Sequence, residues 1–124
     1  MMTDDKKQKG GLSNGVILSQ KRCIPCEAGA PPLTRSEAEE LLKQTEGWSL
    51  SEDTKHISKR FKFKNFVEAV AFVNKITPIA EAEGHHPDLH ISWGKVLVEL
   101  RTHAIKGLSE NDFILAAKID RLLG

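Results

Sequence analysis

The sequence predicts an α+β domain in which three helices cover one face of a four-stranded antiparallel sheet. Apolar residues alternate with polar ones in four short stretches and recur at helical spacing in three others. These stretches follow one another in the order α-β-β-α-β-β-α, and the short turns between paired strands favour antiparallel hairpins. The helices would cover one face of the sheet, which leaves the other face for a ligand or a partner.

Capping residues and apolar periodicity define the three helices. Capping-box patterns, a Ser or Thr followed three residues later by an acid, begin at Thr34 and at Ser109. Asn65 caps the middle helix, whose apolar stripe is wide enough to face a second subunit as well as the core, and Gly84 ends it. Pro78 removes one backbone hydrogen bond inside this helix, so we expect a kink in its last turn.

The four strands are indicated by apolar residues of one parity. The alternation of the last strand continues as far as His103, which places this residue on the more polar face of the sheet. The apolar positions are Trp48 and Leu50; Ile57, Phe61 and Phe63; Leu89, Ile91 and Trp93; and Val96, Val98 and Leu100.

Length, net charge and hydropathy indicate a single domain and argue against a nucleic-acid-binding or membrane-spanning protein. A chain of 124 residues is expected to form one domain, with residues 1–32 as a flexible tail and linker and residues 33–124 as the folded part. A net charge of +1 argues against a nucleic-acid-binding surface. No apolar run approaches the roughly 20 residues that span a bilayer. We expect a cytoplasmic protein, or an organellar one if a targeting segment precedes this sequence.

Two cysteines, Cys23 and Cys26, lie in the N-terminal segment. A zinc site needs about four ligands, and a thioredoxin-like site needs an adjacent βαβ unit, so we expect two reduced thiols in a loop. A metal shared between subunits and a disulfide remain the alternatives.

Four of the five histidines lie between residues 81 and 112, and they are the candidates for chemistry. His85 and His86 precede Pro87, which keeps His86 out of a helix and places the pair on a loop. Imidazoles exchange protons near neutral pH, so this pair and His103 predict acid–base catalysis. The absence of an adjacent Ser or Cys nucleophile pattern favours elimination or addition over acyl transfer.

Two carboxylates lie near these histidines in the sequence, and two other interpretations of the histidines remain open. Glu81 lies one helical turn before His85 and is expected to orient a histidine or take up a proton, whereas Asp112 is equally compatible with a simple helix cap. A three-histidine metal site and purely structural histidines are the alternatives, although adjacent side chains in an extended chain diverge. His56 and His90 share no motif or partner and are expected to be structural.

One run of residues resembles the signature of a known family. Glu81-x3-His85-His86-Pro87-x5-Trp93-x9-His103-x8-Asp112 is similar to the motif of the pterin-4a-carbinolamine dehydratases. Residues 47–48, 61–66 and 107–110 also look like that family, and the similarity extends over residues 34–124.

The resemblance implies an enzyme that removes water from 4a-hydroxytetrahydrobiopterin to give quinonoid dihydrobiopterin, without a metal or other cofactor. Tetrahydrobiopterin would thereby be recycled after aromatic amino-acid hydroxylases act. It implies acid–base roles for His85 and His103 and substrate binding for His86, which would also share in proton transfer. The remaining implied contacts to the pterin or supports of its pocket are Gly84, Thr102, Glu81 and Trp48.

The resemblance also implies partners and leaves an alternative. Family members form homodimers or homotetramers, and animal members also serve as dimerisation cofactors of a homeodomain transcription factor, a partner that nothing in this sequence shows. The alternative function is a protein that keeps the pterin pocket but acts through protein contacts, or a dehydratase-like role in molybdopterin metabolism.

Overall fold

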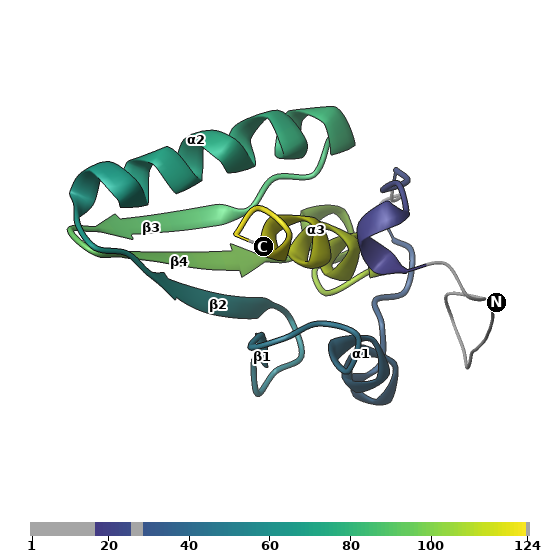
Figure 1. Ribbon diagram of the computed structural model, residues 1–124. Helices are drawn as coiled ribbons and strands as arrows, with labels where there is room; N and C mark the ends of the chain where they lie inside the picture. The colour runs from purple at the N-terminus through teal and green to yellow at the C-terminus, as the bar shows by residue number, and fades with distance from the viewer. Residues whose placement is uncertain (1–16, 26–28, 124) are drawn as a thin grey trace, which may run out of the picture.

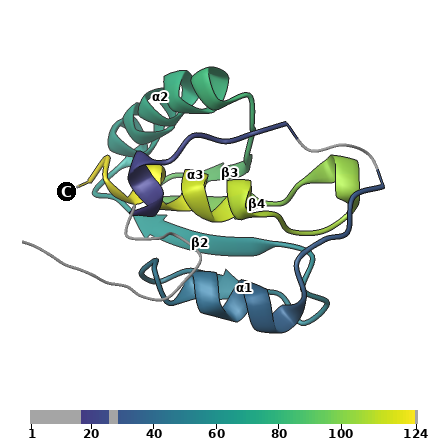
Figure 2. The same cartoon turned by 90° about the vertical axis from the view of Figure 1, so that its right-hand side faces the viewer.

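The computed structural model describes residues 17–25 and 29–123. Its helices pack against one face of a four-stranded antiparallel sheet, so the predicted α+β class is confirmed (Figures 1 and 2). Two short 3-10 helices accompany the main elements. The elements are η2 (Leu18–Gln20), α1 (Arg35–Leu42), β1 (Ser49–Leu50), β2 (Ile57–Lys62), α2 (Phe66–Glu83), β3 (Asp88–Ser92), β4 (Lys95–Leu100), η3 (His103–Ile105) and α3 (Glu110–Asp120).

The sheet has the strand order β1-β2-β4-β3, so the central strands are β2 and β4. Their register pairs Ile57 with Leu100 and Phe61 with Val96. These four apolar side chains are buried, whereas their neighbours along each strand are more exposed. The period-two alternation therefore turns one face of the sheet towards the helices, as the sequence predicted.

Aromatic side chains join the sheet to α2. Phe72, on α2, lies with its ring centroid 4.8 Å from that of Phe61 and 5.0 Å from that of Phe63. Trp48 meets Phe61 edge-on at 6.1 Å, and its indole N–H donates to Asp120 at 3.0 Å. This cluster fixes α2 across the sheet, and the end of α2 carries the histidine pair.

The helix boundaries follow the predicted caps. Thr34 Oγ1 accepts a hydrogen bond from the Glu37 N–H at 3.1 Å, and Glu37 Oε1 accepts one from the Thr34 N–H at 2.9 Å. Ser109 and Asp112 form a second capping box at the start of α3. Asn65 caps α2 by accepting from the Glu68 N–H at 2.9 Å. Pro78 does not end α2, which continues to Glu83.

The strand parity prediction for His103 was wrong. β4 ends at Leu100, and Thr102 forms an isolated antiparallel bridge with Gly107, with its N–H bonded to the Gly107 carbonyl at 2.8 Å. This bridge closes a tight loop in which His103 begins η3 and Lys106 adopts a left-handed φ of 57°. A local bridge, rather than the sheet, therefore sets the position of His103.

Residues 17–25 do not form the free tail that was predicted for residues 1–32. Leu18 is 2% exposed and belongs to the main hydrophobic core. Figure 2 shows the segment crossing in front of α3. Residues 1–16 and Cys26, which were also assigned to the tail, lie outside the described residues.

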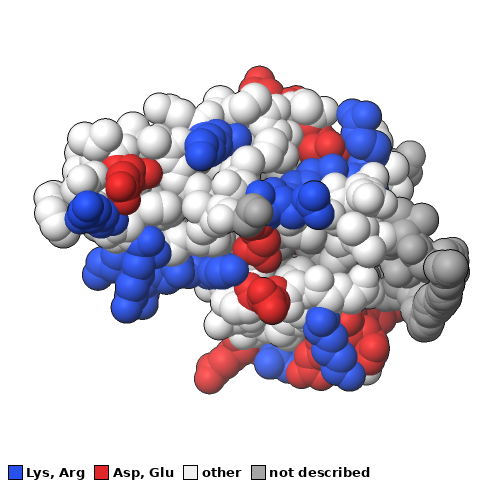
Figure 3. Space-filling view, in the orientation of Figure 1, with Lys and Arg blue, Asp and Glu red and all other residues white. Residues whose placement is uncertain are grey.

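The surface carries charges of both signs. Figure 3 shows basic and acidic side chains side by side over the lower part of the molecule, where α1 lies in Figure 1. Two exposed ion pairs there join Arg35 to Glu39 at 3.2 Å and Lys43 to Glu40 at 3.1 Å. Such pairs contribute little to stability, so the fold depends on its core and caps. Among the described residues, no helix has the length and hydropathy to cross a bilayer.

Gly84 makes the turn that carries the chain from α2 into β3. Its φ is +64°, and its N–H closes the helix on the carbonyls of Ala80 and Glu81. A Cβ at this position would meet no atom within 4 Å, so a substitution is costly only through its backbone conformation.

We therefore predict that Gly84→Ala lowers the free energy of unfolding by about 1–2 kcal/mol, the cost of a left-handed residue with a Cβ. Gly84→Asn should lose less, because asparagine tolerates this conformation. Urea unfolding of the three proteins measures both values. Wild-type stability in the alanine variant would contradict the assigned role of the turn.

Candidate functional site

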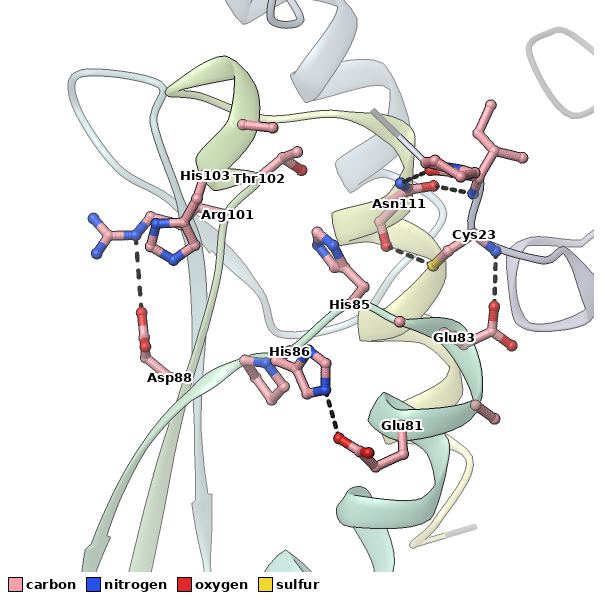
Figure 4. Close-up of a pocket in the computed structure, with 16 residues that line it drawn as sticks. Cys23, Glu81, Glu83, His85, His86, Asp88, Arg101, Thr102, His103 and Asn111 are labelled. Carbon is pink, nitrogen blue, oxygen red and sulfur yellow. Dashed lines mark hydrogen bonds and ion pairs between the residues drawn. The ribbon is translucent and has the colours of Figure 1, made fainter. Parts of the chain in front are cut away.

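A hollow of about 660 Å³ lies where the end of α2 and the end of β4 meet the start of α3 and the N-terminal segment (Figure 4). This volume lies within the range of small-molecule sites. The hollow is lined by residues 23–25, 81–88 and 101–104 and by Asn111. All three predicted catalytic histidines, together with Gly84, Glu81 and Thr102, lie in these segments.

His85 is held by a buried carboxylate. Its Nε2 lies 2.6 Å from Oδ1 of Asp112, and the two side chains are 11% and 0% exposed. An ionised carboxylate only accepts hydrogen bonds, so Nε2 carries a hydrogen. Proton exchange with a ligand then falls to Nδ1, the other ring nitrogen.

Asp112 has two further donors, which explain how its charge is tolerated in the interior. The Thr102 hydroxyl donates to Oδ2 at 2.8 Å, and the Ser109 N–H donates to the same oxygen at 3.0 Å. Because Thr102 has only one hydroxyl hydrogen, Ser109 Oγ must donate to Thr102 Oγ1 across the 2.8 Å that separates them. Asp112 therefore caps α3 and also fixes His85, whereas the sequence left it as a possible simple cap.

Glu81 pairs with His86 and not with His85. Oε2 of Glu81 lies 2.6 Å from Nε2 of His86, and both side chains are more than half exposed. The spacing of one helical turn pointed towards His85, but the left-handed turn at Gly84 comes before the pair and sends His85 towards α3 instead. Each histidine of the pair thus has its own carboxylate.

His103 enters the hollow from a different segment. It begins η3, directly after Thr102, and its side chain is exposed. Figure 4 shows its ring beside Arg101, whose Nε lies 3.8 Å from Oδ2 of Asp88. Three imidazoles from two loops are therefore gathered around one space, with a guanidinium at its edge.

Trp48, which was predicted to support the pocket, and two other histidines lie elsewhere. Trp48 does not line the hollow, since it is buried beside Phe61 with its N–H on Asp120. His56 and His90 are also outside the hollow. We expected these histidines to have no partner, but the Nε2 atoms of His56 and His90 lie 4.0 and 3.1 Å, respectively, from carboxylate oxygens of Glu99. In residues 17–25 and 29–123, no three His, Cys, Asp or Glu side chains are placed to hold one metal ion.

Beside the hollow, Cys23 and Glu83 have pKa values that differ from the ordinary ones. Burial, together with the neighbouring carboxylate of Glu83, raises the pKa of Cys23 to about 12, so this thiol is neutral at physiological pH. Burial alone would raise the pKa of Glu83, but the Cys23 N–H bond and the charges of Lys118 and Arg22 outweigh it and hold that pKa below its ordinary value. Glu83 is therefore a buried anion.

The model of the Pterin 4 alpha carbinolamine dehydratase family matches residues 31–122. The chain belongs to this family. Of its relatives, a protein of Halorhodospira halophila is 51% identical over 105 residues, which are 85% of this chain and 96% of that protein. A protein of Rickettsia canadensis is 55% identical over 84% of this chain and 95% of its own length. Both bear the name "Putative pterin-4-alpha-carbinolamine dehydratase".

Two solved structures share the fold. One, described as a transcriptional coactivator/pterin dehydratase from Brucella melitensis, is 34% identical with a TM-score of 0.71 and covers 75% of this chain and 99% of its own. The other is described as a pterin dehydratase-like protein that is a RuBisCO assembly factor in the alpha-carboxysome. It is 25% identical, has a TM-score of 0.55 and covers 64% of this chain and 92% of its own.

Sequence reasoning missed three parts of this site. The hydrogen bond between Asp112 and His85 was not predicted, although the spacing of Asp112 from His103 belongs to the family motif. Arg101 at the edge of the hollow had no signal of its own. The wall formed by residues 23–25 was hidden because it follows a polar stretch that is typical of tails.

Replacing Asp112 tests the hydrogen-bond network. Asp112→Asn turns one of its two acceptor oxygens into an amide donor, which then faces a group that also donates. We predict a loss of about 1–3 kcal/mol in the free energy of unfolding, the cost of leaving buried polar groups unpaired. Urea unfolding measures it, with Asp88→Asn, at an exposed ion pair, as the control that should stay nearly unchanged.

The lowered pKa of Glu83 makes the stability of the protein dependent on pH. In the folded protein the pKa of Glu83 lies below its ordinary value of 4.5. The ionised side chain therefore contributes fully to stability above pH 4.5, and this contribution disappears as the pH falls through the folded pKa. The difference in unfolding free energy between wild type and Glu83→Gln should therefore shrink between pH 7 and pH 3. Urea unfolding at several pH values measures it, with Glu40→Gln at an exposed position as the control. A difference that is constant with pH would contradict this assignment.

Proposed function

We propose that this protein is a pterin-4a-carbinolamine dehydratase that removes water from 4a-hydroxytetrahydrobiopterin by histidine acid–base catalysis. The observation that carries the proposal is the hydrogen bond between His85 and Asp112 in a hollow that also contains His86 and His103. Membership of the dehydratase family supports the choice of substrate class.

The reaction needs two proton transfers and no nucleophile. The bond between C4a and its hydroxyl breaks, and the hydroxyl leaves as water after taking a proton from an acid. The lone pair of the neighbouring ring nitrogen forms the new C=N bond, and a base takes a proton from a ring nitrogen. An imidazolium and a neutral imidazole supply these roles, each worth roughly 10²–10⁴-fold in rate.

The environments of the three histidines support different tasks. His85 is nearly buried, and its Nε2 is committed to Asp112, so its ring orientation is fixed and Nδ1 is available for proton transfer. His103 is exposed and begins η3, so its ring faces a ligand from a different loop than His85. His86, exposed and paired with Glu81, would bind and orient the substrate.

The products and partners are part of the same proposal. The quinonoid dihydropterin would return to the tetrahydropterin by reduction, which places the protein in tetrahydrobiopterin recycling after an aromatic amino-acid hydroxylase. We also propose that it acts in the cytoplasm as a homodimer or homotetramer.

A second candidate is a role through protein contacts. The solved structure described as a RuBisCO assembly factor favours it, because that protein has the same fold and is described as dehydratase-like. A scaffold has no physical need for three titratable imidazoles, so a His103→Ala variant separates the two. A scaffold would keep its binding, whereas an enzyme would lose its rate.

The direct test is stopped-flow dehydration of chemically generated 4a-hydroxytetrahydropterin. We predict that His85→Ala and His103→Ala each lose at least about 10²-fold in kcat, because each removes one proton-transfer group. His86→Ala should mainly raise KM. His90→Ala is the matched control, because it removes a histidine outside the hollow, and it should retain the wild-type rate.

The same assay includes a chelator arm. The wild-type rate should be unchanged after incubation with a chelator, since the proposed chemistry uses only side chains. A wild-type protein that does not accelerate the spontaneous reaction would overturn the proposed function.

A further inference from the structure

The segment of residues 17–25, here called the N-terminal strap, lies outside the part of the chain that the family model matches. It nevertheless forms one wall of the histidine hollow through residues 23–25. Figure 4 shows Cys23 across from His85, and the side chain of Asn111 extends from α3 to the strap. Three anchors hold the strap against the elements that position His85.

The first anchor joins the start of the strap to α3. Leu18 is buried in the core, and Lys118 donates to the Ser19 carbonyl at 2.9 Å. Lys21 and Glu110 form an ion pair at 2.6 Å. The strap therefore lies along α3 and reaches its first turn, where Asp112 is found.

The second anchor is the side-chain amide of Asn111, which is 5% exposed. Oδ1 accepts from the Ile24 N–H at 3.0 Å, and Nδ2 donates to the Ile24 carbonyl at 2.5 Å. One amide thus satisfies both backbone groups of a residue, as a neighbouring strand would. Asn111 immediately precedes Asp112, so the strap and His85 are fixed by consecutive residues.

The third anchor is the carboxylate of Glu83, whose side chain is 7% exposed. Oε1 accepts from the Cys23 N–H at 2.8 Å, and Oε2 lies 3.2 Å from Arg22 Nε and 3.6 Å from Lys118 Nζ. A buried carboxylate at the C-terminal end of a helix is unfavourable both by desolvation and by the helix dipole. The strap contacts offset that cost.

We propose that Glu83 and Asn111 are positioning residues for the proposed dehydration, and that they act by clamping the strap against the loop that carries His85. Glu83 is two residues before His85, and Asn111 is one residue before the partner of His85. The strap thus fixes both ends of the hydrogen bond between His85 and Asp112 and closes the hollow on that side. Displacing a catalytic group by about 1 Å can cost about 10²-fold in rate.

The inference rests on the proposed function, and its test compares two carboxylates in the full-length chain. Glu83 ends α2, and Asp120 ends α3, where it binds Trp48 and Lys59 away from the hollow. Glu83→Ala and Asp120→Ala therefore each remove a carboxylate with partners at the end of a helix. The first removes the hydrogen bond to the Cys23 N–H beside the hollow, whereas the second removes bonds to Trp48 and Lys59 and none to residues 23–25.

Two quantities are measured for each variant, the dehydration rate and the NMR signals of the histidine rings. We expect Glu83→Ala to lose about tenfold or more in kcat and to shift the ring signals of His85, while those of His90 stay in place. Asp120→Ala should keep both the rate and the His85 signals. Glu83→Gln, which retains an acceptor for the Cys23 N–H, should fall between Glu83→Ala and wild type, and Asn111→Ala should resemble Glu83→Ala.

The outcomes separate this inference from the proposed function. A Glu83→Ala variant with wild-type kcat and unshifted His85 signals overturns the inference, as does an Asp120→Ala variant with equal losses. If Glu83→Ala fails to fold, the dehydration rate and the His85 signals are measured on Glu83→Gln instead. Wild-type values of both in Glu83→Gln would then overturn the inference. If wild type shows no dehydration but the His85 signals still shift selectively, the proposed function fails and the clamp on His85 stands.

Discussion

The buried carboxylate of Asp112 is the constraint on which the site depends. It accepts from His85, Thr102 and the Ser109 N–H, three donors that belong to the α2–β3 loop, the end of β4 and the start of α3. Its side chain is 0% exposed, so the loss of any one donor would reduce the compensation of a charge in the interior. One charged group therefore begins a helix, closes the end of the sheet and fixes the ring of a candidate catalytic histidine.

The elements around this carboxylate explain why its donors converge. The central strands and the aromatic cluster around Phe72 fix α2 across the sheet, and the left-handed Gly84 then turns the chain towards α3. The bridge between Thr102 and Gly107 brings the end of β4 to the same point. The N-terminal strap lies over this junction and meets it through Glu83 and Asn111. Packing far from the hollow thus determines the geometry within it.

Much of this architecture is predictable from local chemistry. Caps such as Asn65 and the capping boxes act within a few residues, and strand alternation follows from burial on one face. Two failures had causes that neither capping residues nor strand alternation reveal. His103 left the sheet because a local bridge replaced strand pairing, and the partner of His85 lies 27 residues away in sequence on another helix. The strap was missed because its ordering depends on Glu83 and Asn111, whose roles are not visible in composition.

The most direct test of the account is the protonation pattern of the His85 ring, measured at neutral pH by long-range ¹H–¹⁵N correlation in the full-length protein. We predict a hydrogen on Nε2 of His85, held by the Asp112 carboxylate, with Nδ1 as the nitrogen that gains or loses a proton. A His85 ring protonated only at Nδ1, with a bare Nε2, would contradict the claim that Asp112 fixes this histidine for proton transfer.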